Sequence, residues 1–201
     1  MLSPTIEQLI KIFAKFPTIG PKTASRFAFY LMEASDEEIE NLIQAIEAIK
    51  KKIKICPLCF RAFENGSLEL CPICENPARK KDLLCVVEKE IDLEAIEKTG
   101  VFKGLYFILG GVFPVLKKAK EPNPLEEKVA LLSERVTKND IKEIILALNP
   151  TLEGQNTVLW LKRKLEPLAV KITQLAKGMP LGGELEYADE ETITSAMEGR
   201  K

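Results

Sequence analysis

The sequence predicts an α/β protein that has a helical N-terminal segment, a small four-cysteine module and a parallel β-sheet flanked by helices. Helical periodicity runs through the first fifty residues, two Cys-x-x-Cys pairs follow, and short apolar runs then alternate with amphipathic stretches. Continuous apolar strands alternating with helices are typical of a parallel sheet covered on both faces. The predicted segments are 1–53, 54–80, 81–178 and a C-terminal tail, 179–201.

The first segment is predicted to contain three helices. Apolar residues recur at helical spacing over residues 5–16, and Pro17-Thr18-Ile19-Gly20-Pro21 interrupts them before a second helix over 22–32. Ser35 with Glu38 predicts a capping box at the start of a third helix. This order is typical of a helix-hairpin-helix, in which Gly20 can take a left-handed conformation and Pro21 suits the first turn of the next helix.

Basic side chains gather around this hairpin. The stretch from Gln8 to Met32 holds four basic residues and no acid. Two of them, Lys22 and Arg26, are four residues apart and share one helical face. Together with free amides at the helix start, they predict contacts to DNA phosphates that read no bases. The alternative is a helical hairpin that only packs or dimerises.

Four cysteines are spaced as two knuckles, Cys56-Pro57-Leu58-Cys59 and Cys71-Pro72-Ile73-Cys74. This spacing predicts one tetrahedral Zn²⁺ per chain, with no open coordination position and therefore a structural role. The alternatives are two disulfides or a redox pair, but no secretory signal is visible and a redox pair needs only one motif. The fifth cysteine, Cys85, lies in an apolar run and is predicted to be a buried strand residue.

The second half alternates strands with helices. Predicted strands cover 83–87, 105–109, 143–148 and 170–172; predicted helices cover 93–98, 125–136 and 157–168, with a short helix near 190–197. Glu88 directly follows the first strand, where ligand-binding groups gather in open α/β sheets. It is either a metal ligand or general base, or an acid stabilised by a helix N-terminus. Asn149 and Thr151 after the third strand carry no charge, so with Glu153 they make a poor magnesium cage.

Composition excludes several classes of protein. The chain has no histidine, which removes the commonest general base. The longest apolar run, 105–116, is interrupted by Gly110, Gly111 and Pro114, so it is too short to span a bilayer. The N-terminus lacks the features of a signal peptide, and the expected compartment is the cytoplasm.

Taken in order, these motifs resemble the RecR family of bacterial recombination mediator proteins, across nearly the whole chain. The matching stretches are 16–26, the four cysteines, 86–88, 148–154 and 182–189. The resemblance implies a helix-hairpin-helix, a four-cysteine zinc finger, a Toprim domain and a C-terminal oligomerisation segment. The chain departs from the family pattern in three places: Thr18 stands where a glycine is usual, Gln155 where a glutamate is usual, and Gly110-Gly111 lies in a segment that often carries a histidine.

The resemblance also implies a function: a non-enzymatic DNA-binding mediator of recombination and DNA repair. It implies a ring-shaped homotetramer on double- or single-stranded DNA, acting with RecO and RecF to load recombinase onto single strands coated by single-strand-binding protein. On this interpretation Glu88 and Glu153 are expected to contact a basic surface of a partner. The main alternative is a metal-dependent Toprim enzyme using Glu88, against which the missing Asp-x-Asp at 149–151 argues. A third hypothesis is a zinc-ribbon adaptor that binds only proteins.

Overall fold

The computed structural model describes residues 2–64, 66, 68–113, 124–175, 178–179 and 182–200. The chain divides into two compact units, Met1–Ile53 and Lys54–Lys201, and each is described by itself. Within the described ranges, no helix is both long enough and apolar enough to cross a membrane.

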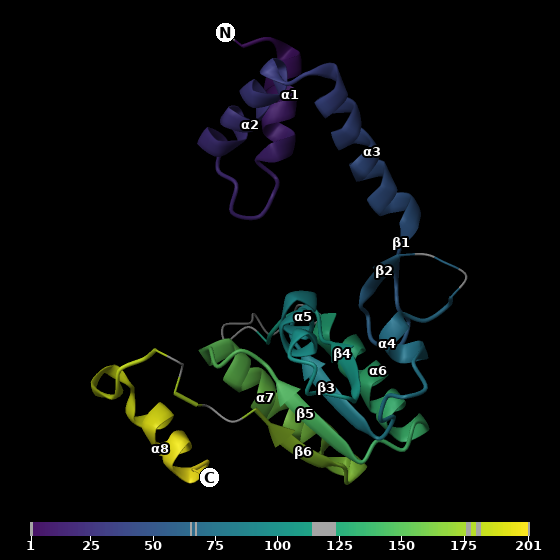
Figure 1. Cartoon of the computed structure of the whole chain (residues 1–201), viewed down its shortest axis with the longest axis vertical. Coiled ribbons are helices and arrows are strands. Elements are labelled where there is room, and N and C mark those ends of the chain that lie inside the picture. The colour runs from purple at the N-terminus through teal and green to yellow at the C-terminus, as the bar shows by residue number, and fades with distance from the viewer. Residues whose placement is uncertain are drawn as a thin grey trace. The chain divides into compact units, whose positions relative to one another are not determined.

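The first unit consists of three helices, α1 (Pro4–Phe13), α2 (Pro21–Glu33) and α3 (Asp36–Lys52) (Figure 1). α1 and α2 pack as a hairpin, because Ala24 and Ala28 are fully buried and let the two helices approach closely. Phe13 packs edge-on against Phe27, with ring centroids 5.8 Å apart. α1 ends three residues earlier than predicted, because the N–H groups of Lys15 and Phe16 donate to carbonyls only three residues back, which tightens the chain out of the α-helix.

The capping box predicted for α3 is confirmed. The backbone N–H of Ser35 donates to the carboxylate of Glu38 at 3.0 Å, and the N–H of Glu38 donates to the Ser35 hydroxyl at 3.3 Å. α3 has no buried residue, and four of its large apolar residues are 41–61% exposed: Leu42, Ile43, Ile46 and Ile49. Phe27 of α2 is also 41% exposed. The first unit therefore presents apolar surface that its own helices do not cover.

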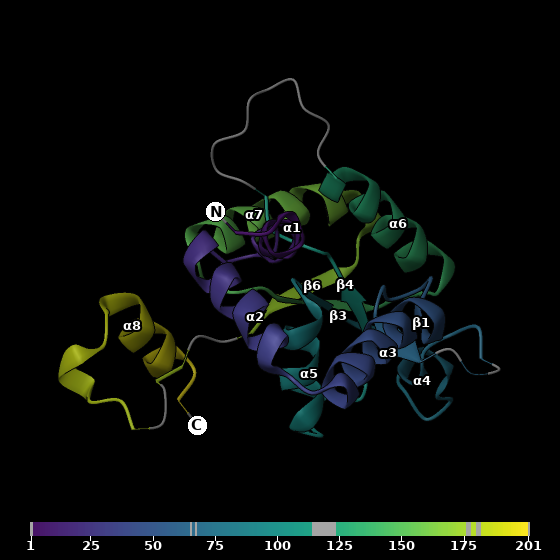
Figure 2. The ribbon, with the colours of Figure 1, turned by 90° about the horizontal axis from the view of Figure 1, so that it is seen from above.

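The second unit is built on a four-stranded sheet in the order β4-β3-β5-β6, all parallel. Its strands are β3 (Leu83–Val87), β4 (Leu105–Ile108), β5 (Glu143–Ala147) and β6 (Lys171–Gln174). The helices are α5 (Glu90–Lys98), α6 (Pro124–Lys138) and α7 (Leu152–Leu165), followed by a 3-10 turn, Glu166–Leu168. Figure 2 shows α6 and α7 on one side of the strands and α5 on the other. The predicted parallel α/β sheet is confirmed.

Each face of the sheet has its own hydrophobic cluster. One face packs against α6 and α7 through residues such as Leu84, Phe107 and Leu132. The opposite face packs against α5 and against the four-cysteine module, which contributes Phe63 and Ile73 to the same cluster. The cysteine module therefore shares its core with the sheet, instead of forming a lobe of its own.

The module comprises β1 (Ile53–Ile55), β2 (Ala62–Glu64) and one short helical turn, α4 (Pro72–Glu75). The tail contains a 3-10 turn, Leu185–Tyr187, and the predicted short helix, α8 (Glu190–Glu198), capped by Asp189. α7 begins at Leu152, five residues before its predicted start. The reason is local: the Thr151 hydroxyl accepts a hydrogen bond from the N–H of Gly154 at 3.1 Å and so caps the helix.

Candidate metal centre and nucleic-acid interface

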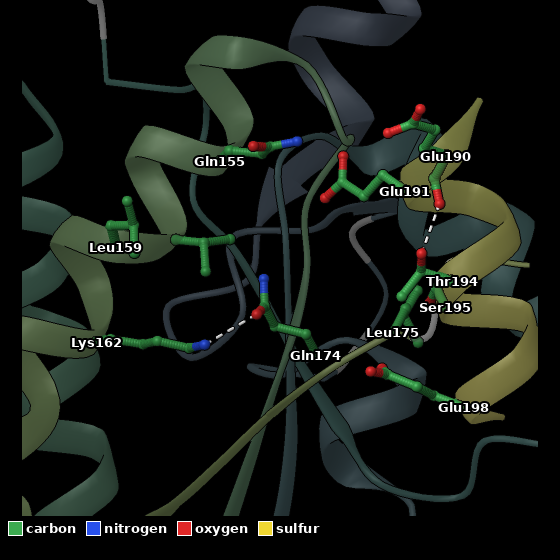
Figure 3. Close-up of a pocket in the computed structure, with 11 residues that line it drawn as sticks. Gln155, Leu159, Lys162, Gln174, Leu175, Glu190, Glu191, Thr194, Ser195 and Glu198 are labelled. Atoms are coloured by element: carbon green, nitrogen blue, oxygen red, sulfur yellow. Dashed lines mark hydrogen bonds between the residues drawn. The ribbon is translucent and has the colours of Figure 1, made fainter.

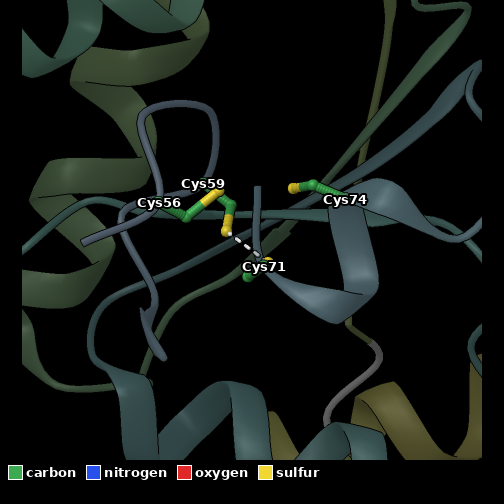
Figure 4. Close-up of side chains that lie close together, drawn as sticks. All are labelled: Cys56, Cys59, Cys71 and Cys74. Atoms are coloured by element: carbon green, nitrogen blue, oxygen red, sulfur yellow. Dashed lines mark hydrogen bonds between the residues drawn. The ribbon is translucent and has the colours of Figure 1, made fainter. Parts of the chain in front are cut away.

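The four cysteines predicted as metal ligands converge in one buried group (Figure 4). Their sulfur atoms all lie within 4.8 Å of one another, and the Sγ atoms of Cys59 and Cys71 are 3.4 Å apart. A tetrahedral site with Zn–S bonds of ~2.3 Å requires sulfur separations of about 3.8 Å. The four thiols, Cys56, Cys59, Cys71 and Cys74, therefore fit a metal ion of this size.

The first knuckle is a tight turn held from both sides. The N–H of Cys56 donates to the carbonyl of Arg61 at 2.8 Å, and the N–H of Phe60 donates to the carbonyl of Cys56 at 2.9 Å. Phe60 has a φ of 64°, a left-handed conformation that strains a residue other than glycine. Its ring packs edge-on against Phe107 of β4 at 5.2 Å and faces the ammonium of Lys128, so contacts with the sheet unit hold the strained turn in place.

Close packing of the thiols separates their acidities. A hydrogen bond from Cys59 is the main cause that holds the pKa of Cys56 well below its ordinary value, and the same interaction raises the pKa of Cys59. Cys85 lies outside the group, in β3 as predicted, and burial raises its pKa to about 12. Cys85 is therefore an inert core thiol that lies outside the four-cysteine group.

The module is attached to the free edge of the sheet. The N–H of Ile108 in edge strand β4 donates to the carbonyl of Cys59 at 2.9 Å. Beyond the second knuckle, Arg79 pairs with Glu97 of α5, which also accepts a hydrogen bond from the Tyr106 hydroxyl at 2.8 Å. Burial alone would raise the pKa of Glu97, but the hydrogen bonds from Arg79 and Tyr106 outweigh it and hold that pKa below its ordinary value.

Arg135 of α6 is a buried residue that the sequence analysis missed. Its guanidinium donates to two backbone carbonyls, one of them in the first knuckle, and its Nη2 lies 4.0 Å from the sulfur of Cys74. Nothing in the cysteine spacing points to a residue 61 positions further along the chain. The sequence signal for Arg135 is its position among the apolar residues of a predicted helix. This signal is weak, because long charged side chains often reach solvent from such positions.

Lys22 and Arg26 lie exposed on one face of α2, as predicted. Within residues 2–53, neither takes part in an ion pair. The first turn of α2 carries no acid, and the N-cap residue supplies no side-chain hydrogen bond to the amides there. The hairpin therefore combines two free cations with backbone N–H groups that lack a side-chain acceptor.

Gly20 does not use the left-handed conformation that a glycine permits. Gly20 is extended, with φ −82° and ψ 168°, and the left-handed residue of the turn is Thr18, with a φ of 64°. An N-cap residue takes extended angles so that its carbonyl can accept the first helical hydrogen bond, here from Ala24 at 2.9 Å. The reversal of chain direction thus falls two residues earlier, on a β-branched side chain.

Glu88 directly follows β3, as predicted, but its carboxylate is not exposed. The residue is only 6% exposed; its oxygens accept a hydrogen bond from Asn149 Nδ2 at 3.0 Å and pair with Lys89 Nζ at 2.8 Å. Burial would raise the pKa of Glu88, but the bonds from Lys89 and Asn149 prevail and lower it. Glu153 lies exposed in the first turn of α7. Of the two glutamates predicted to contact a basic partner surface, only Glu153 is therefore exposed.

The tail helix borders a polar groove. Figure 3 shows the groove between α8 on one side and α7 with β6 on the other; its volume is about 770 Å³. Lys162 Nζ donates to Gln174 Oε1 at 2.9 Å on the sheet side, and Glu190 and Glu198 line the α8 side. α8 has no buried residue. The tail therefore gains little from packing against its own body.

The described residues thus form a modular α/β protein that has a helical hairpin with two exposed cations, a buried four-cysteine group and a parallel sheet. Three family profiles match the chain: "RecR, helix-hairpin-helix" over residues 6–50, "Toprim domain" over 82–176 and "RecR, C-terminal" over 178–201. The chain belongs to the RecR family, which confirms the resemblance seen in its motifs.

Curated relatives agree along the whole length. The chain is 43% identical over 196 residues to "Recombination protein RecR" of Bifidobacterium animalis subsp. lactis, covering 98% of this chain and 95% of the relative. Proteins of the same name from Chloroflexus aggregans (43% over 202 residues; 100% and 95%) and Dehalococcoides mccartyi (42% over 196 residues; 98% and 93%) match similarly.

Proposed function

We propose that the chain is a non-enzymatic DNA-binding mediator of recombination in DNA repair. The observation that carries this proposal is the hairpin, where Lys22 and Arg26 are exposed, form no ion pair within residues 2–53, and lie at a start of α2 that has no side-chain cap. Amides at a helix N-terminus bind phosphate, and the two cations can hold adjacent phosphates of the same strand. Such contacts read no bases, so binding would be independent of sequence on double- and single-stranded DNA.

The salt dependence of binding tests this site. Replacing both Lys22 and Arg26 with alanine should weaken binding to unrelated sequences alike and flatten the slope of log affinity against log salt by about one to two units per bound subunit. The matched control replaces Lys50 and Lys52, which are exposed on α3 and carry the same total charge. Equal losses in both double variants would mean that net charge, and not the hairpin, drives binding.

The proposed cofactor is one structural Zn²⁺ per chain, held by Cys56, Cys59, Cys71 and Cys74. Four thiols buried at tetrahedral separations support it, because soft thiolate ligands select zinc and leave no position for substrate. Bound zinc would join the two knuckles to each other and, through the carbonyl of Cys59, to the edge of β4. Metal analysis of protein prepared without chelator should find about one zinc per chain.

The Toprim domain is proposed to act as a scaffold and not as a catalyst. Cleavage of DNA by metal ions needs several carboxylates around the scissile phosphate. Glu88 is engaged by Lys89 and Asn149, while the hydroxyl of Thr151 caps a helix. The second candidate, a magnesium-dependent DNA-processing enzyme, rests on the position of Glu88 at the carboxyl end of β3. Magnesium-dependent nicking that disappears in Glu88→Gln would establish that candidate.

We further propose that the chain assembles into a ring-shaped homotetramer. Support comes from the uncovered apolar residues of α1 to α3 and from a tail helix with no buried residue of its own. In a closed ring, several weak phosphate sites act together and raise affinity through effective concentration. Deleting residues 178–201 should give smaller species in light scattering. A full-length chain that is monomeric at micromolar concentration, with and without DNA, would contradict the ring.

The proposed partners are RecO and RecF, with which the chain would load recombinase onto coated single strands in the cytoplasm. Exposed Glu153 offers a direct contact for a basic partner surface, whereas buried Glu88 would act by holding Asn149. Glu153→Ala should therefore weaken RecO binding and leave DNA binding by the isolated chain intact. Glu88→Gln, which keeps an acceptor for Asn149, should have the smaller effect on RecO binding; the reverse order would assign the contact to Glu88.

A further inference from the structure

Arg135 extends from α6 past the edge strand β4 to the cysteine group on the other face of the sheet. Its Nη1 donates to the carbonyl of Leu58 at 2.6 Å and to the carbonyl of Tyr106 at 2.7 Å, while Nη2 lies 4.0 Å from Cys74 Sγ. Leu58 lies inside the first knuckle and Cys74 inside the second. One side chain therefore contacts both knuckles and the strand beneath them.

The charge of this guanidinium has no carboxylate partner. Arg135 is 6% exposed, and among the residues that the structure describes no acid lies within ion-pair distance of it. Its Nε is buried and makes no hydrogen bond. A buried charge is costly unless a compensating charge lies nearby, and neutral carbonyls compensate only in part. Cys74 Sγ, 4.0 Å from the guanidinium, would carry negative charge as the thiolate ligand of a bound metal.

We propose that Arg135 is a positioning residue for the four-cysteine centre, where its charge compensates the excess negative charge of a bound metal and its thiolates. The inference rests on the proposed metal site. Four thiolates around a divalent ion leave a net charge of about −2, and this group lies in an apolar cluster with Val87, Leu93 and Ile108. A cation beside one sulfur lowers the cost of burying that charge, while the bonds to Leu58 and Tyr106 orient the guanidinium.

Metal affinity measured by chelator competition tests the proposal. Arg135→Gln keeps a hydrogen-bond donor but removes the charge, and it should weaken zinc binding by about 10- to 100-fold, as loss of an outer-shell partner does. Arg135→Lys keeps the positive charge but loses the planar guanidinium that donates to two groups at once, so its zinc affinity should fall several-fold. Cobalt substituted for zinc gives a second readout, because the sulfur-to-metal absorption bands should shift in Arg135→Gln.

The matched control is Arg79→Gln. Arg79 is a half-buried arginine that contacts backbone carbonyls at Phe102 and Gly104 and pairs with Glu97, but among the described residues it bonds to no cysteine. The Arg79→Gln substitution should lower thermal stability equally with and without metal, and its zinc affinity should stay within about twofold of the parent. Arg135→Gln should instead lose more stability in the zinc-loaded protein than in the metal-free protein.

The outcomes are distinct. Arg135→Gln binding zinc as tightly as Arg79→Gln, or Arg135→Lys losing as much affinity as Arg135→Gln, would overturn the proposal. If Arg135→Gln yields no folded protein, Arg135→Lys decides: several-fold weaker zinc binding at unchanged metal-free stability supports the proposal, and unchanged affinity refutes it. A parent chain that binds no zinc would refute the proposed metal site itself. This outcome differs from a parent that binds zinc and an Arg135→Gln variant that binds it equally well, which would refute only the role of Arg135.

Discussion

Two buried thiols of the same hydrophobic cluster provide a matched test of the metal site. Cys74 belongs to the four-cysteine group and Cys85 to β3, and they are 8% and 1% exposed. Replacing either with alanine removes one sulfur atom from the core, which costs about 1 kcal/mol by analogy with the loss of one methyl group. Only Cys74→Ala also removes a metal ligand, so any difference between the two variants reports on the metal.

The expected size of that difference follows from linkage. Metal at 1,000 times its dissociation constant stabilises the folded state by about 4 kcal/mol. For a unit of about 150 residues, each kcal/mol changes Tm by roughly 2–4 °C. Cys85→Ala should therefore lower Tm by about 2–4 °C, and Cys74→Ala in the presence of zinc by roughly 10–20 °C.

Thermal unfolding with zinc and with a chelator measures both effects. The chelator should bring the parent and Cys85→Ala down by the metal contribution and should leave Cys74→Ala almost unchanged. If the two variants melt together and the chelator changes neither, the four thiols hold no stabilising metal, and the assignment of a structural zinc is refuted. Metal analysis of each variant verifies that the loss of zinc accompanies the loss of stability.

Three further predictions concern the backbone and pH. Thr18→Gly should raise the free energy of unfolding by up to about 1 kcal/mol, since relief of left-handed strain exceeds the entropy gained by the unfolded chain. Gly20→Ala, at an extended position with open space, should cost at most about 1 kcal/mol. A lower free energy of unfolding in Thr18→Gly would show that the turn is unstrained. Gly154→Ala should lower the free energy of unfolding, measured with denaturant, by at least about 2 kcal/mol, because the added Cβ would lie 1.9 Å from the carbonyl oxygen of Asn149. An unchanged free energy would contradict this close contact. Because the pKa of Glu97 is lower in the folded than in the unfolded chain, ionised Glu97 stabilises the fold at pH values above its unfolded pKa, and this stabilisation should disappear as pH falls through its folded pKa. Glu97→Gln should therefore make stability depend less on pH in the acid range. An unchanged pH dependence would exclude Glu97 as its cause.

The sequence by itself determined the elements and the metal ligands, because both follow from short-range patterns. Apolar runs such as 83–87 and 143–148 became parallel strands, since a strand buried on both faces must be apolar at successive positions. Each cysteine knuckle brings its own two sulfurs together through a local turn, so the spacing predicts the four ligands. Lys22 and Arg26 share a face because helical geometry places residues four apart together.

Only the tertiary structure decided what depends on contacts between distant segments. The strand order β4-β3-β5-β6 leaves β4 at an edge, and that free edge receives Cys59 and lets Arg135 reach Cys74. The burial of Glu88 likewise depends on Asn149, 61 residues away, which lies beside it because β3 and β5 pair. Local periodicity carries no information on which strands pair, because strand neighbours are selected by the packing of helices and loops from the whole domain.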